Sequence, residues 1–542
     1  MPETAPHPPW FDVIAPKAED AVIPRLLARG ARDYPDDLCV RFDSGLEWRY
    51  GQAWDLARRS AAALAGLGVA AGERVLVWLP NGAPLIRAWF GLNTLGAVFV
   101  PLNVAYRGAV LEHVIRLTGA SLIIAHSGLV EHLAGIDTGS LRRVIVAGAM
   151  PSSCGTLEVL PESVLEAEAA PVALPDLEIW DTAAILMTSG TTGPSKGVVN
   201  PYGQLYVAGI AAHGYLKRGD RLYLFTPLFH TLGLLAAFAV LSRGASFHVA
   251  ESFHAKTFWQ DVRGAGCNRI LGLIASMAAY LAATVPAESD CPFDFTMMQP
   301  ITAETRAFAQ RMGFSYFSAY SMTEVSVPIL SRIDDDCLGV TGRPRTGIEC
   351  RLVDENDIEV PVGAVGQLIV RADQPWTLNG GYLNDPQATL AAWRNGWFHT
   401  GDAFRRDEAG NYYFVDRLKD AIRRRGENIS SYEVEREIAA FPGVREVAVI
   451  GANDAYGGQE VMAVMVVEAP DRFDCAALLD HLRPRLAHFA IPRYVRIVEA
   501  LPRTPTNKIR KDVLRSAGIT LDTWDREKEG IAVRRVRLDA AS

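Results

Sequence analysis

The sequence lacks features that mark several classes of protein. No apolar run reaches the roughly 18 residues of a membrane-spanning helix, so we expect no membrane span. Its seven cysteines form no CxxC pair and no zinc-ligand spacing, which predicts reduced thiols in a cytoplasmic compartment and no zinc site. The first 20 residues contain no charged leader before an apolar segment, so we expect no secretory signal.

An excess of positive charge is absent as well. The 542 residues include 54 lysines and arginines against 62 aspartates and glutamates, a formal net charge of -8. General binding to nucleic acid needs a broad basic surface that replaces the counterions of the phosphate backbone, so we expect no nucleic-acid partner. A polyphosphate ligand would have to be held by a few local groups.

The arrangement of apolar residues is that of a large α/β protein. Short apolar runs, such as residues 74–79 and 97–101, alternate with segments of helical period, such as 55–67 and 110–118. This alternation predicts a large domain of β-sheets flanked by helices. With 49% hydrophobic and 21% charged residues, the chain has an ordinary globular composition.

The pattern changes twice along the chain. From about residue 339 it consists of short alternating segments broken by turn residues, which predicts a small β subdomain over about 339–415. A compact α+β unit follows. We therefore predict an N-terminal domain over 1–418 and a smaller C-terminal domain over 419–542.

The stretch TSGTTGPSKG, residues 188–197, has the composition of a phosphate-binding loop. Its glycines let backbone amides turn inward, and its hydroxyls and one lysine add donors for an anion. It is not a P-loop, because Lys196 follows Ser195 rather than a glycine and no helix begins directly behind it. For this segment alone, a surface loop of small residues is an equally good interpretation.

Three further segments carry polar residues suited to a nucleotide. YSMTE, residues 320–324, places an aromatic ring, a hydroxyl and a carboxylate within one short stretch. GWFHTGD places Asp402 on a glycine-bounded turn, where it can accept both hydroxyls of a ribose or simply close a hairpin as an Asx turn. TPLFH places His230 after a predicted strand, where open α/β sheets bind ligands. Chance or a structural role explains each segment taken alone.

In their order along the chain, these segments resemble the serial motifs of the adenylate-forming superfamily. The series is TSGTTGPSKG, TPLFH, YSMTE, WFHTGD, YFVDRLKDAIRRRGENIS and PRTPTNK. The resemblance covers about residues 20–515, and the superfamily includes acyl-CoA synthetases, aryl-CoA ligases, adenylation domains of nonribosomal synthetases and firefly luciferase. NDPQAT, residues 384–389, and RRGENI, residues 424–429, are most similar to bacterial CoA ligases of the crotonobetaine/carnitine type.

The resemblance implies a two-step reaction. A carboxylic acid attacks the α-phosphate of ATP, pyrophosphate leaves, and the thiol of coenzyme A then attacks the acyl-AMP. Both reactants of the first step are anions, so positive charge must be supplied locally. A stand-alone adenylation enzyme that loads a carrier protein would share every motif, as would a luciferase-like oxygenase; an inactive binding protein is a third alternative. The assembly stays open, with a homodimer among the options.

The resemblance also implies a role for each matching residue. Tyr320 would stack on adenine, Thr323 would touch the α-phosphate, and Glu324 would hold Mg²⁺, which prefers carboxylate and phosphate oxygens. Asp402 and Arg417 would bind the ribose. The β- and γ-phosphates would be wrapped by residues of the opening loop: Thr188, Ser189, Gly190, Thr191, Thr192 and Lys196.

The remaining implied roles concern the acid and the thiol. Lys508 would bridge the α-phosphate and the attacking carboxylate, which suits a compact charge on a long stem. His230 would stand at the mouth of the acyl site and govern access for the thiol. In this superfamily the C-terminal domain reorients between the two steps, here about a hinge at Lys419. Gly426 would then permit the close passage of pantetheine.

Two places depart from the superfamily's pattern. The glycine-alanine-rich turn beside adenine and the acyl group corresponds to residues 297–302, which include Met298 and Gln299. The glycine after the stacking tyrosine is replaced by Ser321. Larger side chains at these places would narrow the acyl site or add a hydrogen bond. The sequence therefore does not identify the acid, and a fatty acid cannot be assumed.

Overall fold

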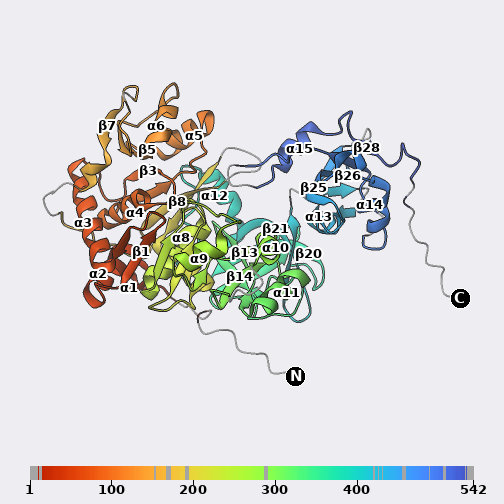
Figure 1. Cartoon of the computed structure of the whole chain (residues 1–542), viewed down its shortest axis with the longest axis horizontal. Helices are drawn as coiled ribbons and strands as arrows, with labels where there is room; N and C mark the ends of the chain where they lie inside the picture. The colour runs from red at the N-terminus through yellow and green to blue at the C-terminus, as the bar shows by residue number, and fades with distance from the viewer. Residues whose placement is uncertain are drawn as a thin grey trace. The chain divides into compact units, whose positions relative to one another are not determined.

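The computed structural model describes most of the chain. Described are residues 10, 15–151, 154–166, 172–188, 195–285, 291–418, 422–424, 427–429, 431–453, 459–486, 489–504, 508–531 and 533. The chain divides into two compact units, and Figure 1 labels many of their elements. The first unit is Met1–Arg351, Ile369–Thr400 and Asp407–Tyr413. The second is Leu352–Leu368, Gly401–Arg406 and Phe414–Ser542.

The first unit contains a seven-stranded sheet in which neighbouring strands are parallel except for the last pair, β8 and β9. In spatial order its strands are β7 (Glu158–Pro161), β6 (Arg143–Ala147), β5 (Leu122–His126), β3 (Arg74–Trp78), β4 (Val98–Pro101), β8 (Thr182–Thr188) and β9 (Lys196–Pro201). Parallel neighbours need crossover connections, and helices supply most of these. The predicted alternation of strands and helices is confirmed.

A second, five-stranded sheet has parallel neighbours except for its last pair. Its strands are β12 (Arg269–Ile270), β10 (Arg221–Leu224), β11 (Ser246–Val249), β1 (Leu38–Phe42) and β2 (Glu47–Arg49). The helices of the first unit are α1 (Ala18–Ala21), α2 (Ile23–Asp33), α3 (Tyr50–Gly66), α4 (Ala83–Leu95), α5 (Gly108–Thr118), α6 (Ser127–Val130), α7 (Tyr202–His213), α8 (Thr231–Arg243), α9 (Phe258–Gly264), α10 (Ala275–Thr284), α11 (Ala303–Met312) and α12 (Pro386–Ala392).

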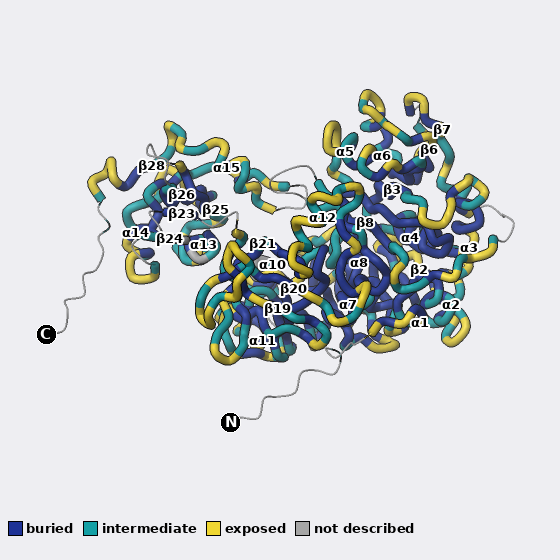
Figure 2. The backbone as a smooth tube through the Cα atoms, turned by 180° about the vertical axis from the view of Figure 1, so that it is seen from behind, coloured by how far each residue is buried: buried dark blue, intermediate teal, exposed yellow. Residues whose placement is uncertain are grey.

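The alternating side chains of β3 belong to two different hydrophobic clusters. Val75 and Val77 pack into the main core, which also holds residues of α2, α3, α4, α7 and α8. Leu76 and Trp78 pack into a smaller core beneath α5 and α6, which lie beside β5 in Figure 1. α4 and α8 are buried along most of their length (Figure 2). A helix that is apolar on all sides is expected in such a position.

Shorter sheets follow along the chain. β13 (Leu273–Ile274), β14 (Phe295–Gln299) and β15 (Ser315–Phe317) form one parallel sheet. The next sheet is antiparallel and is formed by β16 (Ala319–Met322), β17 (Ser326–Leu330) and β18 (Arg343–Pro344). A four-stranded sheet contains in order β19 (Ile348–Val353), β20 (Val365–Ala372), β21 (Phe398–Arg406) and β22 (Tyr412–Arg417).

The second unit has its own α+β core. Its elements are β23 (Ile422–Arg424), β24 (Glu427–Ile429), α13 (Ser431–Ala439), β25 (Val444–Asn453), β26 (Gln459–Val467), α14 (Cys475–Leu482), β27 (Tyr494–Ile497), α15 (Lys511–Ala517) and β28 (Trp524–Asp525). Alternate residues of β26 pack with α13 and α14 on one face and with α15 on the other. The predicted boundary at residue 419 stays a prediction, and Lys419 lies outside the described residues.

Two further observations concern the whole described chain. None of its described helices combines the length and hydropathy that a membrane crossing requires. All seven cysteines are free thiols.

Candidate active site

The two ends of the predicted phosphate loop are adjacent. β8 and β9 pair antiparallel with Thr188 opposite Lys196, and the Thr188 hydroxyl lies 3.3 Å from the Lys196 carbonyl oxygen. The described ends therefore place a hydroxyl and an ammonium at the base of the loop. Four of the predicted phosphate contacts lie outside the described residues: Ser189, Gly190, Thr191 and Thr192.

Other elements of the first unit brace the base of this loop. His113 on α5 places Nε2 2.8 Å from the carbonyl oxygen of Ser195. β9 is paired with residues 380–383, where the amides of Gly380 and Leu383 each donate to a carbonyl oxygen of β9 at 2.8 Å. The base of the loop is thus fixed by a helix on one side and by a distant chain segment on the other.

Tyr382, within that distant segment, contacts two of the predicted site residues. Its hydroxyl donates to Oε1 of Glu324 at 3.0 Å, and the Lys196 ammonium lies 4.8 Å from the centre of its ring. Burial raises the pKa of the Tyr382 hydroxyl, and the nearby Glu324 carboxylate adds to the rise. The phenol is therefore a hydrogen-bond donor at neutral pH.

Three buried amide side chains hold the backbone of Thr323 and Glu324. Gln204 donates to the Thr323 carbonyl oxygen at 2.9 Å, and Asn200 donates to the same oxygen at 3.2 Å. Asn379 donates to the Glu324 carbonyl oxygen at 2.8 Å. Buried carbonyl groups need such partners, and these partners leave the side chains of Thr323 and Glu324 to other contacts.

The hydroxyl of Thr323 has a partner at the start of α8. The Oγ1 atoms of Thr323 and Thr231 are 2.7 Å apart. Thr231 is the first residue of α8, and His230 immediately precedes it as the N-cap residue. Burial lowers the pKa of the His230 imidazole, so this side chain is neutral at neutral pH. The structure thereby places His230 next to the partner of Thr323.

Tyr320 lies on β16, two residues before the end of that strand. It is 5% exposed, and its hydroxyl lies 3.7 Å from Sδ of Met322. Ser321, which stands where the superfamily has glycine, is exposed. At the other departure from the pattern, Met298 is fully buried and Gln299 is partly buried. Of these, Ser321 is the position most open to a ligand.

The two predicted ribose ligands meet in the second unit. Nε of Arg417 lies 3.6 Å from Oδ1 of Asp402, and Asp402 is 6% exposed. The strands that carry them are joined where the Leu418 amide donates to the Gly401 carbonyl oxygen at 3.0 Å. A carboxylate beside a guanidinium is a strong hydrogen-bond acceptor.

The backbone of Lys508, in the second unit, is held by Thr504. Its backbone amide donates to the Thr504 hydroxyl at 3.1 Å, and its carbonyl oxygen accepts from the Thr504 amide at 2.7 Å. The residue is exposed. Gly426, the predicted pantetheine contact, lies outside the described residues, as does Lys419.

Comparison with known proteins assigns the chain to a family. Residues 27–383 match the AMP-binding enzyme family, and residues 433–508 match the AMP-binding enzyme C-terminal domain. The chain belongs to the AMP-binding enzyme family. The superfamily resemblance drawn from the motifs is confirmed.

This AMP-binding enzyme is similar to several CoA ligases along most of its length. It is 32% identical to the crotonobetaine/carnitine–CoA ligase of Salmonella arizonae over 84% of this chain and 91% of the relative. It is 30% identical to the sulfoacetate–CoA ligase of Cupriavidus necator, over 93% of this chain and 98% of the relative. ATP-bound MatB from Rhodopseudomonas palustris shares its fold, with a TM-score of 0.79 and 26% identity over 91% and 98% of the two chains.

The site of this AMP-binding enzyme includes residues that the motifs did not indicate. Tyr382 lies two residues before the polar run that begins at Asn384, which was a weak signal. Thr231 follows the motif histidine, but nothing marks its hydroxyl as a partner of Thr323. Asn200 lies near the end of β9, and Gln204 lies in the first turn of the largely apolar α7. Polar residues buried at a strand-to-helix junction are the one signal that could have suggested them.

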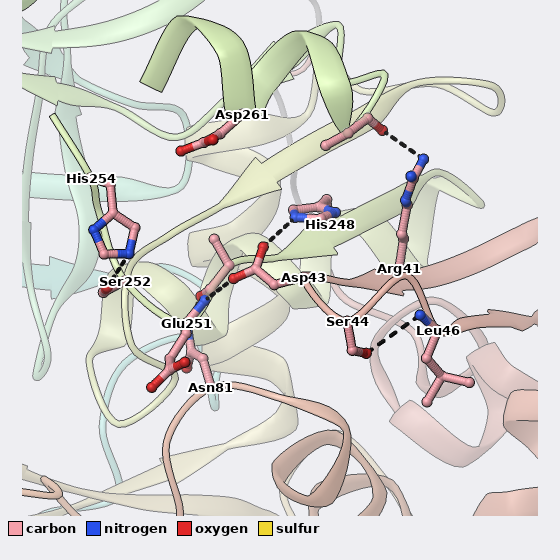
Figure 3. Close-up of polar contacts among 12 residues, drawn as sticks. Arg41, Asp43, Ser44, Leu46, Asn81, His248, Glu251, Ser252, His254 and Asp261 are labelled. Atoms are coloured by element: carbon pink, nitrogen blue, oxygen red, sulfur yellow. Dashed lines mark hydrogen bonds and ion pairs between the residues drawn. The ribbon is translucent and has the colours of Figure 1, made fainter. Parts of the chain in front are cut away.

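A second polar cluster lies at the ends of β1 and β11 and is drawn in Figure 3. Nε2 of His248 is 2.8 Å from Oδ1 of Asp43, and Oδ2 of Asp43 accepts from the Glu251 amide at 2.9 Å. Tyr223 stacks on the imidazole, with ring centres 5.5 Å apart. Both carboxylate oxygens have partners from neighbouring chain segments, so this cluster joins the two parallel strands.

The residues present fit a divalent cation that arrives with a nucleotide. Within the described part of the chain, no group of three or more histidine, cysteine, aspartate or glutamate residues is placed to hold a metal ion. Mg²⁺ usually relies on one or two carboxylates together with substrate phosphates. Glu324 supplies such a carboxylate. It lies two residues after the end of β16, the strand that contains Tyr320, and its carboxylate accepts a hydrogen bond from the Tyr382 hydroxyl.

Proposed function

We propose that this AMP-binding enzyme is an acid–thiol ligase. It joins a carboxylic acid to AMP with release of pyrophosphate and then transfers the acyl group to coenzyme A. The observation that carries the proposal is the contact of Tyr382 with both Glu324 and Lys196. This contact brings a carboxylate suited to a metal–nucleotide complex near a cation at the base of a phosphate loop.

In the first step, the first unit binds and orients ATP. The loop between β8 and β9, including Thr188 and Lys196, surrounds the β- and γ-phosphates. Tyr320 stacks on adenine, and the Thr323 hydroxyl donates to an α-phosphate oxygen. Mg²⁺ held by Glu324 would neutralise phosphate charge, which is the main obstacle when an anionic acid approaches an anionic phosphate.

The second unit completes the first step and then prepares the second. Asp402 and Arg417 hold the ribose hydroxyls, and the Lys508 ammonium bridges the acid and the α-phosphate. After acyl-AMP forms, the domain that begins at Lys419 turns about that hinge, which withdraws Lys508 and brings Gly426 toward the pantetheine arm. His230, neutral because of burial, borders the acyl site and governs entry of the thiol without repelling or attracting charge.

The names of the relatives and the residues of the acyl site bear on the size of the acid. The two relatives are named for crotonobetaine or carnitine and for sulfoacetate, so we propose an acid of that size class before a long-chain fatty acid. Met298 and Gln299 replace small residues of the superfamily's turn, which is consistent with a narrow acyl site. We place the reaction in the cytoplasm.

The test is a screen of carboxylic acids for AMP and pyrophosphate release with ATP, Mg²⁺ and coenzyme A present. The panel contains crotonobetaine, carnitine, sulfoacetate, short and long fatty acids and aromatic acids. We expect release with at least one acid and an acyl-CoA product. Acid-dependent pyrophosphate without acyl-CoA, together with transfer to a carrier protein's phosphopantetheine, would favour the carrier-loading alternative. No acid-dependent release across the panel would overturn the proposal.

A further inference from the structure

Tyr382 has contacts that a packing residue does not need. Its ring faces the Lys196 ammonium at 4.8 Å, and its hydroxyl donates to Oε1 of Glu324 at 3.0 Å. Packing against β9 requires neither a cation on the ring nor a carboxylate on the hydroxyl. One side chain therefore contacts both charged groups that the proposed function assigns to the metal–nucleotide complex.

The backbone around Tyr382 is fixed independently of those two contacts. Tyr382 forms a β-bridge with Val198 of β9, and its amide donates to the Thr389 hydroxyl at 2.9 Å. The preceding residue, Gly381, has a φ of +100°, and a Cβ there would lie 2.9 Å from the Thr389 side chain. Only glycine fits such a position. The direction of the Tyr382 side chain is therefore set by its surroundings.

The same chain segment also holds the backbone of Glu324. Asn379 donates from Nδ2 to the Glu324 carbonyl oxygen at 2.8 Å, and its Oδ1 accepts from the Gly381 amide at 2.8 Å. Glu324 is 5% exposed, so its carboxylate has little water to orient it. A hydrogen bond from a hydroxyl to a buried carboxylate is about twice as strong as one between neutral groups. The Tyr382 hydroxyl is thus well suited to hold the carboxylate in one rotamer.

We propose that Tyr382 is a positioning residue for the adenylation step. Its hydroxyl orients the Glu324 carboxylate toward the metal–nucleotide complex, and its ring holds the Lys196 ammonium at the base of the phosphate loop. This inference rests on the proposed function, because Glu324 and Lys196 matter only if the site binds ATP with a divalent cation. The inference adds Tyr382 as the residue that fixes the positions of the Glu324 carboxylate and the Lys196 ammonium relative to each other.

Two substitutions separate the contributions of the hydroxyl and the ring. Tyr382→Phe keeps the ring beside Lys196 and removes only the donor to Glu324. Tyr382→Leu removes both. Tyr316→Phe is the matched control, because its hydroxyl donates to the Asp335 carbonyl oxygen at 3.1 Å, a backbone contact outside the site. Thermal unfolding of each variant checks that the fold is retained.

The decisive readout is binding rather than turnover. The dissociation constant of ATP is measured by calorimetry with EDTA and then with saturating Mg²⁺, and the ratio gives the enhancement by the metal. For Tyr382→Phe we expect affinity in EDTA within about twofold of the native protein, and an Mg²⁺ enhancement reduced by about tenfold. For Tyr382→Leu we expect affinity in EDTA to fall as well, since the Lys196 ammonium loses its partner.

The outcomes are distinguishable from failure of the proposed function. If the native protein shows no acid-dependent pyrophosphate release and no Mg²⁺-enhanced ATP binding, the proposed function fails. If the native protein shows both, the Mg²⁺ enhancement of ATP affinity in Tyr382→Phe decides the inference. An enhancement equal to that of the native protein or of the Tyr316→Phe control overturns the inference about Tyr382. An equal loss of ATP affinity with and without Mg²⁺ in Tyr382→Phe would also overturn it, because that pattern indicates a general packing defect.

Discussion

Glu324 and Asp43 are both carboxylates beside the end of a β-strand, yet their surroundings differ. Asp43 uses both oxygens to join neighbouring segments, one to the His248 imidazole and the other to the Glu251 amide. Its side chain is 53% exposed. Around Glu324, in contrast, buried amides bind the backbone carbonyl groups, and a tyrosine hydroxyl donates to the carboxylate.

The difference separates a carboxylate that holds the fold together from one that the fold holds in place. At Asp43 the carboxylate itself joins the neighbouring segments, and both of its oxygens are bonded within the protein. At Glu324 neutral groups do the connecting, and the charge is kept under 10% exposed, where electrostatic interactions are strong. Support by neutral side chains is what a site needs when the charge must meet a ligand.

The largest expected effect tests whether this principle extends to the second unit. The backbone of Lys508, like that of Glu324, is held by another residue, here Thr504, whereas its side chain, unlike that of Glu324, is exposed. Lys508→Ala should lower acyl-AMP formation by about 10³-fold, because a pre-organised cation at a developing negative charge contributes on that order. The measurement is acid-dependent pyrophosphate release in single turnover.

The second half-reaction is the control for Lys508. Thioester formation from supplied acyl-AMP and coenzyme A should keep at least half of its native rate, since the lysine is withdrawn in that step. Equal losses in both half-reactions would contradict the division of labour between the two steps.

The next largest effect is expected when the two compared carboxylates, Glu324 and Asp43, are each replaced by the corresponding amide. Glu324→Gln keeps the size of the side chain and an acceptor for Tyr382 but removes the charge, so we expect acyl-AMP formation to fall by about 100-fold. Asp43→Asn, the matched change, should alter that rate by less than about twofold. Initial rates at saturating acid, ATP and Mg²⁺ provide the measurement.

Similar losses of acyl-AMP formation in the two variants would contradict the distinction between a carboxylate that joins chain segments and one that is held in place for a ligand. A raised Mg²⁺ requirement confined to Glu324→Gln would sharpen it, because only that carboxylate is expected to meet the metal.

Local patterns predicted much of this molecule. The apolar runs at 74–79 and 97–101 are β3 and β4, and the helical periods at 55–67 and 110–118 lie largely within α3 and α5. The loop at residues 188–197 and the lysine within it were also readable, because they are encoded in one continuous stretch. Family membership then followed from the order of the motifs.

Contacts between distant segments were not readable from the sequence. Tyr382 is 58 residues from Glu324, and Thr231 is 92 residues from Thr323. The segment of Tyr382 joins β9 through an isolated bridge rather than a strand with a periodic pattern. Hydrophobic periodicity shows which face of an element is buried, but it does not show which polar groups will meet across the core.

A third prediction asks what a buried polar side chain costs when no carboxylate accompanies it. His213 is fully buried, with its Nδ1 3.2 Å from the Tyr215 hydroxyl, and burial lowers its pKa to about 3. In the unfolded chain this histidine has a pKa of about 6.5. As the pH falls, the unfolded state therefore takes up the proton before the folded state does. Stability is therefore lost below about pH 6.5, and the loss ends near pH 3. Between pH 7.5 and pH 5 it should reach about 2 kcal/mol.

The quantity to measure is the change in the apparent midpoint of thermal unfolding between pH 7.5 and pH 5. In His213→Asn the part of this shift due to His213 should disappear, whatever the variant's absolute stability. His248→Asn should leave most of the shift in place, because the Asp43 carboxylate partly offsets the lowering of the His248 pKa by burial. If His248→Asn removed more of the shift than His213→Asn, a carboxylate partner would not reduce the loss of stability that a buried histidine causes at low pH.

The smallest expected effect concerns the hydroxyl pair behind the proposed α-phosphate contact. A hydroxyl donates one hydrogen bond, so Thr323 can donate to a phosphate only if Thr231, 2.7 Å away, donates to it. Thr231→Val should therefore slow acyl-AMP formation by about tenfold, while Thr231→Ser should restore it to within about threefold. Thr118→Val, which loses a hydroxyl bonded to the Val114 carbonyl oxygen, is the control for general loss of a buried hydroxyl. If Thr231→Ser and Thr231→Val are equally slow, the methyl group of Thr231 matters rather than its proton, and the neutral support inferred around Thr323 reduces to packing.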